Sequence, residues 1–461
     1  MNVNAAIPPD EGLARVLGLR SAILLVVGSV IGSGIFLTTG GMAAVIPSAS
    51  LLLMAWVLGG VLAITGALTY AEMGAMFPRS GGVYVFLKEA YGPLVAFLYG
   101  WAGLFVVISG GIAAVAVGFA TYLNFFLPGL GTFSSLGLSG TKLVAASVIV
   151  LLGAINYAGV RSGNMVNVIT TTAKVAALAA LPIMAIVAAR VTPVYLPIVP
   201  PDLVRPSAAF GVAMIAVLWT YEAWYFVTYA SGEIKDPQRN IPRALVSGIL
   251  ILMSIYVLVN VAYLYALTID EMKGTTRIAE RAATALIGPP GATFIALTVV
   301  VSTFGNNGAA LLAGSRLLFA MASDGVFLPA ASRVHPRFRT PHIAIVALTI
   351  WSAVLALSGT YEQLFTYVMF ASILFSVAAG IALFVLRRKM PERPRPYRTW
   401  GYPVVPLIFI LGSLAFVANT LLERPTESLA GLGLLALGLP AYWYWGRRVR
   451  PDYGTRRQDR L

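Results

Sequence analysis

The sequence predicts an all-α integral membrane protein of about 12 transmembrane helices. Only 11% of the 461 residues are charged and 58% are hydrophobic, whereas about 25% of the residues in a typical soluble domain are charged. The apolar residues gather in runs of roughly 20, the length with which a helix crosses a bilayer. The cations fall in alternate connections between these runs, as the positive-inside rule describes.

Composition also excludes several kinds of site. The chain has no cysteine, which excludes a disulfide-linked subunit, thiolate metal sites and thiol catalysis. Its two histidines, His335 and His342, lie in one connecting region and cannot form a buried multi-histidine metal site. We therefore expect no metal, no cofactor and no catalytic residue. The net charge of +14 does not predict a nucleic-acid partner, because the cations follow the membrane topology.

Twelve runs are long enough to span a bilayer. They cover residues 21–46, 50–76, 92–126, 141–158, 165–190, 207–231, 243–268, 292–322, 341–358, 360–386, 403–422 and 428–446. The weakest boundary lies at Ser358-Gly359-Thr360, between the ninth and tenth runs.

The distribution of lysine and arginine predicts the orientation. With the N-terminus in the cytoplasm, 23 of the 32 cations fall on the cytoplasmic side, seven fall outside, and Lys174 and Arg316 lie within spans. This bias predicts a multi-pass protein of the plasma (inner) membrane with both termini cytoplasmic. We expect residues 1–20 to form a cytoplasmic N-terminal segment without a cleavable signal. Residues 387–402 are a basic cytoplasmic loop, and residues 447–461 a basic tail at the membrane surface.

The spacing of the runs predicts an internal repeat. The first and sixth, third and eighth, and fifth and tenth runs recur at similar offsets. Five helices are an odd number, so the two units have opposite orientations, as in the inverted repeats of secondary transporters. The first five-helix repeat covers 21–190 and the second 207–386, while helices 11 and 12 occupy 403–446.

The first run contains Gly28, Gly32 and Gly34 close together. Glycines so placed favour a break in the helix, and a break frees backbone groups that must line a cavity or meet a ligand. The second half-helix would then offer N–H donors to a carboxylate. Alternatively, the small residues only allow close packing between helices. Spacing alone supports both interpretations equally.

Several segments together resemble a known family. They are Gly32–Phe36, Tyr70–Gly74, Pro78–Tyr84, Gly232–Ala244, Ser315–Met321 with Asp324-Gly325, and Arg395–Pro406. In this order they resemble the motifs of the amino acid–polyamine–organocation superfamily, and most of all its L-type amino-acid transporter branch with that branch's bacterial relatives. The resemblance covers nearly the whole chain beyond residue 15.

The resemblance implies a LeuT-like 5+5 inverted repeat with broken helices 1 and 6, two extra C-terminal helices and alternating access. It implies that the backbone around Ile31, Gly32, Ser33 and Gly34 holds a substrate carboxylate. Carbonyl groups of the same break and of the sixth helix would hold the amino group. Trp219 would then stand at the position of an aromatic outer gate, which excludes water from a bound amino acid.

The residues of the sixth run do not themselves predict a break. No glycine or proline interrupts Val217–Trp224, so pattern alone predicts a buried aromatic helix. Glu222 stands where the branch more often has glycine or aspartate. An ionised acid at membrane depth costs at least about 2.5–3.5 kcal/mol and marks a functional site by default. It could attract a substrate's amino group or a second cationic group, or stay protonated and bond a neighbour.

Lys174 lies deep in the fifth run, roughly 13 Å from the predicted cytoplasmic end of the helix. By resemblance, its ammonium group replaces the sodium ion of coupled relatives and bridges helices one, five and eight. It could also exchange a proton, or act as a fixed structural charge.

The sequence thus predicts a secondary active transporter of amino acids, a permease or exchanger that is sodium-independent and not an enzyme. Its expected partners are a small amino acid or amine and the lipid bilayer. The alternatives are a proton-coupled importer of cationic amino acids or polyamines, and an amino-acid sensor that does not transport.

Overall fold

The computed structural model describes residues 15–79, 81–135, 137–159, 163–325 and 327–446. The N-terminal segment up to residue 14, Arg161 and the tail from residue 447 lie outside these ranges, and so do the predictions made for them.

The first span consists of two half-helices, the second is one long helix, and the third is built from several consecutive helical segments. The elements are α1 (Leu19–Val30), α2 (Gly34–Val45), α3 (Ala49–Met76), α4 (Val83–Tyr91), α5 (Pro93–Ala102), the π-helical η1 (Gly103–Val107) and α6 (Ile108–Phe126). A short connection with an antiparallel β-pair and two more helices complete this half. They are η2 (Pro128–Leu130), β1 (Ser134–Ser135), β2 (Leu138–Ser139), α7 (Gly140–Tyr157) and α8 (Gly163–Ala188).

The second half repeats the pattern of a broken first helix. Its elements are α9 (Pro206–Tyr221), the 3₁₀ helix η3 (Trp224–Glu233), α10 (Pro237–Ala266), α11 (Ile269–Met272), α12 (Ile278–Ile287), α13 (Pro289–Ser323), η4 (Pro329–Ser332), α14 (His342–Ser358) and α15 (Tyr361–Lys389). Two further helices, α16 (Val404–Glu423) and α17 (Pro425–Gly446), follow.

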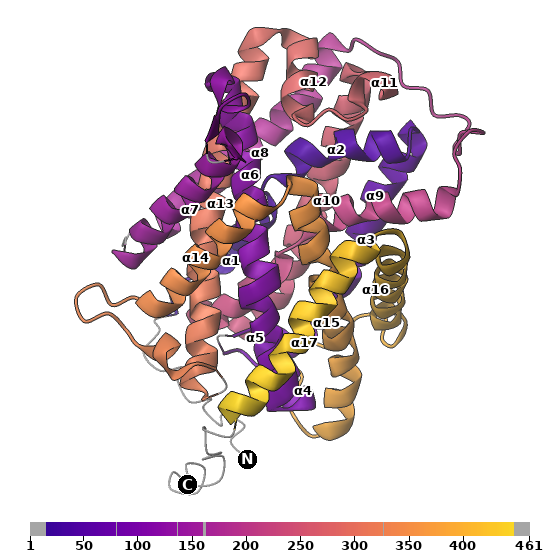
Figure 1. The fold of residues 1–461 in the computed structure, drawn as a ribbon. Helices are drawn as coiled ribbons and strands as arrows, with labels where there is room; N and C mark the ends of the chain where they lie inside the picture. The colour runs from indigo at the N-terminus through magenta and orange to yellow at the C-terminus, as the bar shows by residue number, and fades with distance from the viewer. Residues whose placement is uncertain (1–14, 80, 136, 160–162, 326, 447–461) are drawn as a thin grey trace, which may run out of the picture.

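The prediction of an all-α membrane fold is confirmed (Figure 1). Within the described ranges, nine helical spans are long and apolar enough to cross a bilayer, with α5 to α6 and α9 to η3 each counted as one span, and the bent pair of α1 and α2 makes a tenth. Helix α14 is apolar but has only 17 residues. The predicted boundary between the ninth and tenth spans is correct, because Thr360 and Gln363 form a capping box that starts α15.

The long helices run between two faces of the molecule (Figure 1). One, called the α4 face below, carries α4 and the ends of η3, α13 and α15. The opposite one, the α12 face, carries α11 and α12. Helix α3 lies inside the bundle against α9, α10 and α16. Exposed leucines of α16, such as Leu407 and Leu411, have the apolar character that a lipid-facing surface requires.

The basic loop is not a free surface loop where it meets α3. Glu72 is fully buried and accepts two hydrogen bonds from Arg387, at 2.9 and 2.6 Å, and one of 2.7 Å from the Thr399 N–H. The Arg387 guanidinium also lies 3.6 Å from the centre of the Tyr402 ring. These contacts tie α3, α15 and the loop into one unit and give the buried carboxylate three hydrogen-bond donors.

Candidate functional site

The first break lies between α1 and α2, which are bent by 41° at Ile31, Gly32 and Ser33. Gly34 must be glycine here, because a Cβ at this position would lie 2.4 Å from the Thr220 Oγ1 atom. A Cβ at Gly32 would make only ordinary contacts, the nearest at 3.7 Å. The close approach of α2 to α9 therefore explains why residue 34 is glycine. The break lies at the position where the glycine pattern predicts that one can form.

The break leaves hydrogen-bond donors at the start of α2. Among the described residues, no backbone carbonyl accepts from the N–H groups of Ser33, Gly34 or Ile35. These groups form the positive end of the α2 dipole and can accept an anion. Ile31, Gly32, Ser33 and Gly34, the residues predicted to bind a carboxylate, thus lie together at a helix end whose chemistry suits that ligand.

Carbonyl groups at the end of α1 are held by two polar side chains from other helices. The Lys174 ammonium of α8, only 3% exposed, donates to the Ile31 oxygen at 3.0 Å and the Gly28 oxygen at 3.4 Å. The amide of Asn306 in α13 donates to the Ser29 oxygen at 3.1 Å. A cation is stabilised at this negative end of a helix. Lys174 of α8 donates to carbonyl groups of α1. Asn306 links α1 to α13, which is the eighth of the predicted spans.

The second break separates α9 from η3. Glu222 is extended and Ala223 has a φ of 72°, in the left-handed region. The prediction of a continuous helix from the residue pattern is therefore wrong, and the break implied by the resemblance is present. A non-glycine residue in this conformation costs on the order of 1–3 kcal/mol, and such strain clusters at functional sites. The hydroxyl of Tyr256 lies 3.2 Å from the Thr220 oxygen and 3.3 Å from the Val30 oxygen, which joins the two breaks.

Glu222 turns its carboxyl group toward hydroxyl donors. The Tyr225 hydroxyl donates to it at 2.7 Å and the Ser372 hydroxyl of α15 at 2.5 Å. The residue as a whole is only partly buried. Both hydroxyls donate to the same carboxyl oxygen, Oε1. Sequence reasoning found Glu222 but not its partner Ser372, because Ser372 is 150 residues away.

Trp219 lies one turn before the second break and is joined to the first through Tyr361. The indole N–H donates to the Tyr361 hydroxyl at 2.9 Å, and the Ser33 hydroxyl lies 2.9 Å from the same oxygen. The indole also stacks on Phe365, with the ring centres 6.0 Å apart and the planes 19° from parallel. This cluster covers the breaks on the side of the α12 face. Tyr361 was missed, although the Tyr361 and Phe365 pair at i and i+4 was visible in the sequence.

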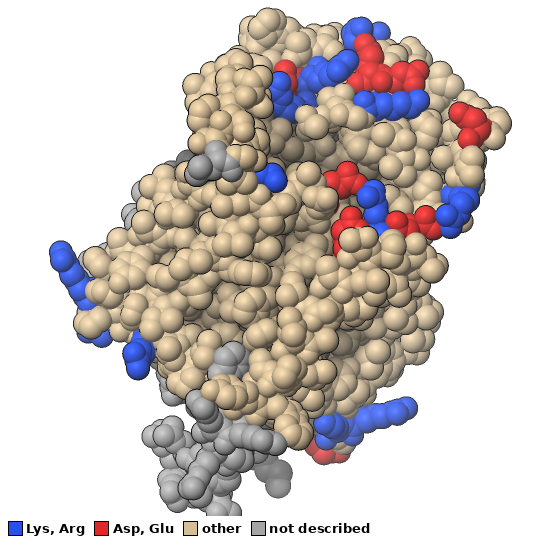
Figure 2. Space-filling model, in the orientation of Figure 1, with Lys and Arg blue, Asp and Glu red and all other residues tan. Residues whose placement is uncertain are grey.

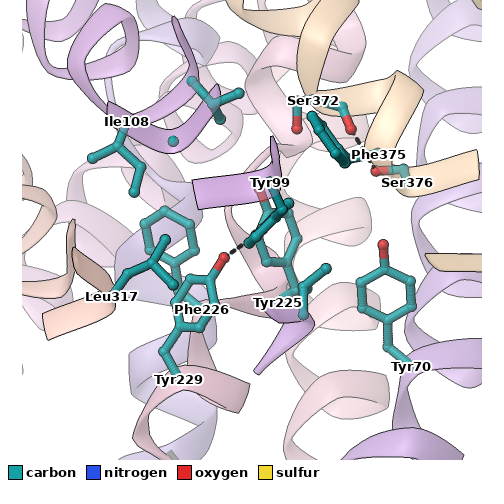
Figure 3. Close-up of a pocket in the computed structure, with 13 residues that line it drawn as sticks. Tyr70, Tyr99, Ile108, Tyr225, Phe226, Tyr229, Leu317, Ser372, Phe375 and Ser376 are labelled. Carbon is teal, nitrogen blue, oxygen red and sulfur yellow. Dashed lines mark hydrogen bonds between the residues drawn. The ribbon is translucent and has the colours of Figure 1, made fainter. Parts of the chain in front are cut away.

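A tyrosine-lined crevice extends from the second break toward the α4 face (Figure 3). It contains Tyr70, Tyr99, Tyr225 and Tyr229, with Ser372 and Ser376 from α15. Figure 3 shows the hydroxyls of Tyr99 and Tyr229 in contact across it. The cavity has a volume of about 10 Å³, which is the space of about one water molecule. No amino acid could pass through it in this conformation.

Further contacts close the α4 face below the crevice. The backbone of Leu17 pairs with Ile234 as an isolated parallel bridge. Arg316 of α13 donates to Glu233 at 2.9 Å. Both breaks are therefore covered on both sides, by aromatic stacking toward the α12 face and by backbone and ionic contacts toward the α4 face.

Comparisons with known proteins agree with this architecture. A family model described as amino acid permease matches residues 17–431. The serine/threonine exchanger SteT of Bacillus subtilis (strain 168) is 33% identical over 95% of this chain and 98% of its own. The human large neutral amino acids transporter small subunit 2 is 31% identical over 95% and 82%. The human b(0,+)-type amino acid transporter 1 is 31% identical over 91% and 85%. The predicted superfamily and branch are confirmed, and the chain belongs to the amino acid permease family.

Proposed function

We propose that this protein is a sodium-independent exchanger of small amino acids that works by alternating access. The observation that carries the proposal is the meeting of two broken helices. The unpaired N–H groups at the start of α2 lie beside the end of α9. The strained break after α9, at Ala223, frees backbone carbonyl groups there. A zwitterionic amino acid matches this arrangement, because its carboxylate and its ammonium group need opposite helix ends.

In this proposal the carboxylate binds the N–H groups of Ser33, Gly34 and Ile35. The ammonium group binds carbonyls that the break after Tyr221 releases from α9. Trp219 covers the ligand on the side of the α12 face, where it excludes water and adds apolar contact. The side chain of the substrate then points toward the space in front of Glu222.

Lys174 supports sodium independence. Its ammonium group already donates to the Ile31 and Gly28 oxygens, which are the kind of ligands that a sodium ion would need. A second cation there would meet direct repulsion from the first, which is severe in a poorly solvated interior. A fixed charge in place of an ion leaves the substrate gradient as the driving force, and so favours exchange.

The named exchange activity of the Bacillus subtilis relative, which spans almost the whole chain, supports exchange of small amino acids here. Glu222 supports a second candidate, the proton-coupled import of cationic amino acids or polyamines. Its carboxyl group is bonded by hydroxyls rather than by a cation, so it remains free to attract a positive charge or to carry a proton.

The cation bias supports a plasma-membrane location with the α4 face and both termini in the cytoplasm. In that orientation the Trp219 cluster controls access from outside, and the contacts of Leu17, Glu233 and Arg316 control access from inside. The covered breaks then correspond to an occluded state between the two open ones.

Uptake of labelled serine and arginine into proteoliposomes tests the proposal. We expect uptake only when amino acid is loaded inside, with equal rates in sodium and choline buffers. Uptake without internal amino acid that an inward proton gradient accelerates would favour the second candidate. If labelled amino acid binds but never exchanges in any gradient, the protein is a sensor and the proposal is wrong.

A further inference from the structure

A groove on the α12 face takes no part in the transport site described above. It lies between α11, α12 and the ends of α8 and α10, and its volume is about 620 Å³. Pockets that bind small molecules usually enclose about 300–1,000 Å³. Figure 2 shows basic and acidic side chains gathered on this part of the surface. The groove therefore has the size of a small-molecule site and a charged lining.

Basic groups outnumber acidic ones in the lining. Four cations, Arg190, Lys273, Arg277 and Arg281, face two carboxylates, Glu271 and Glu280. Arg190 and Glu271 form an ion pair of 2.9 Å. The Thr268 backbone N–H and the Arg190 guanidinium both hold the pKa of Glu271 below its usual value, so this carboxylate stays ionised and committed to that pair.

Arg277 and Arg281 are left with too few acceptors. Glu280 lies 3.3 Å from the Arg277 Nε atom. The Arg277 Nη1 atom is buried, and in the described part of the chain nothing accepts from it. No described residue pairs with the exposed side chain of Arg281 either. The two guanidinium groups thus bring at least one surplus positive charge to the groove.

The position of these two arginines is unfavourable without an anion. They are four residues apart at the beginning of α12, where like charges repel each other. They also stand at the positive end of the helix dipole, which favours anions over cations. A bound carboxylate would remove both penalties, because arginine and carboxylate form charge-assisted and often bidentate hydrogen bonds.

We propose that this groove binds a small carboxylate, held by Arg277 and Arg281. The bound group is the carboxylate of an arriving amino acid or that of another small organic acid. If it is the amino acid, the groove raises the local concentration of substrate above the closed Trp219 cluster. This use rests on the proposed transport function, whereas binding of the carboxylate does not.

Thermal unfolding of the purified full chain tests binding independently of transport. The probe is glutarate, a dicarboxylate without an amino group, compared with chloride at constant ionic strength. We expect glutarate to raise the melting temperature of the wild type. We also expect Arg281→Gln to weaken the apparent affinity about tenfold, the loss expected for one charge-assisted hydrogen-bonded pair. The matched control is Lys142→Gln, which removes a cation near the start of α7 that does not line the groove.

Exchange measurements in proteoliposomes then separate the two sources of carboxylate. If the groove captures substrate, Arg281→Gln raises the external KM severalfold, while kcat and the internal KM remain as in Lys142→Gln. If it binds other organic acids only, glutarate stabilises the protein but both variants transport alike. Equal glutarate effects in the wild type, Arg281→Gln and Lys142→Gln would overturn the proposal, even if the protein exchanges amino acids normally.

Discussion

Lys174 illustrates how a single buried charge can organise a broken helix. Carbonyl groups at the end of α1 have no partners within their own helix, and an unpaired buried carbonyl costs about 1–3 kcal/mol. The ammonium group donates to two of these oxygens, and the Asn306 amide donates to a third. The end of α1 is therefore held in place by contacts with α8 and α13.

Lys174→Met should lower kcat/KM for exchange by about 10–100-fold, equivalent to about 1.4–2.7 kcal/mol. The ammonium group and its hydrogen bonds are lost, although the chain length of the side chain is largely kept. Initial rates in proteoliposomes would measure the effect, with Lys142→Met as the control for loss of one cation. Wild-type rates in Lys174→Met would contradict the role given to this residue.

Glu222 is held by hydroxyl groups rather than by a cation. Glu222→Gln keeps an oxygen that accepts from Tyr225 and Ser372, whereas Glu222→Ala leaves both hydroxyls without their acceptor. We therefore expect the alanine variant to lose about 1–3 kcal/mol of stability and the glutamine variant to lose much less. Thermal unfolding in one detergent would compare them, and equal losses would show that the hydrogen bonds contribute little.

The glutamine variant also separates the two transport candidates. Without the negative charge, uptake of arginine should fall relative to uptake of serine if Glu222 faces the substrate's side chain. An unchanged ratio of the two rates would place Glu222 outside the substrate contacts. Uptake of both amino acids from one mixture would measure this ratio.

The sequence identified several residues of the site but not the residues that they contact. Lys174, Glu222 and Trp219 were recognisable because a charge at membrane depth, or an aromatic residue in a familiar motif, is visible locally. Their partners Tyr361 and Ser372 are ordinary residues of an apolar helix. Only the fold brings the Tyr361 hydroxyl to Ser33, 328 residues away.

At the scale of elements, the close contact between α2 and α9 positions the N–H groups of the first break. Gly34→Ala should abolish exchange and lower the melting temperature, because its Cβ would lie 2.4 Å from Thr220 Oγ1 and 2.9 Å from Thr220 Cβ. Both atoms belong to Thr220, a buried residue whose backbone Cα would also lie only 3.0 Å from the added Cβ. Such overpacking usually costs about 1–3 kcal/mol.

Gly41→Ala is the matched control for this prediction. Gly41 lies in the same helix, but a Cβ at this position would meet nothing within 4 Å. We expect this variant to exchange at the wild-type rate with equal or slightly higher stability, since alanine favours helix over glycine. If both variants behaved alike, close packing of α2 against α9 would not be the reason for Gly34.

The two breaks differ in how far sequence could predict them. Gly32 and Gly34 allow the first break, so residue pattern and resemblance agreed there. The second has Glu222 and Ala223, which have no local preference for breaking a helix. Tertiary contacts to Tyr256 and Ser372 stabilise it instead, and such contacts are invisible in a window of sequence.

At the scale of the whole molecule, contacts on both faces close the routes to the two breaks. The Trp219 cluster closes the route from the α12 face, and the Glu233–Arg316 pair helps to close the route from the α4 face. Because the chain has no cysteine, Ser376→Cys in the crevice would be a unique thiol for labelling from the α4 face. Glu233→Gln should increase its labelling rate by up to about fivefold, since an exposed ion pair contributes up to about 1 kcal/mol. Glu89→Gln, which breaks the Arg79–Glu89 pair on the same face, should leave the rate unchanged.

A rate that Glu233→Gln leaves unaltered would show that the Leu17–Ile234 contact alone closes this side. Added substrate should also change the labelling rate, because alternating access exposes the crevice in only one of the two open states. A substrate-independent rate would argue for a protein that binds without changing shape.

The overall architecture was predictable because hydrophobic length and cation placement are global signals that do not depend on single contacts. The spans and their order follow from those signals. The burial of Glu72 beneath Arg387 and Thr399 could not be predicted, since it depends on how the basic loop folds back on α3. Length and charge place a loop on a side of the membrane but do not describe its internal contacts.

The most direct test of the account is a structure of the protein in lipid with a bound substrate amino acid, determined by electron cryomicroscopy. The account predicts density for the carboxylate within hydrogen-bonding distance of the Ser33, Gly34 and Ile35 N–H groups, with the ammonium group at the end of α9. Density for the amino acid only in the groove beside Arg277 and Arg281, or none between the two breaks, would contradict it.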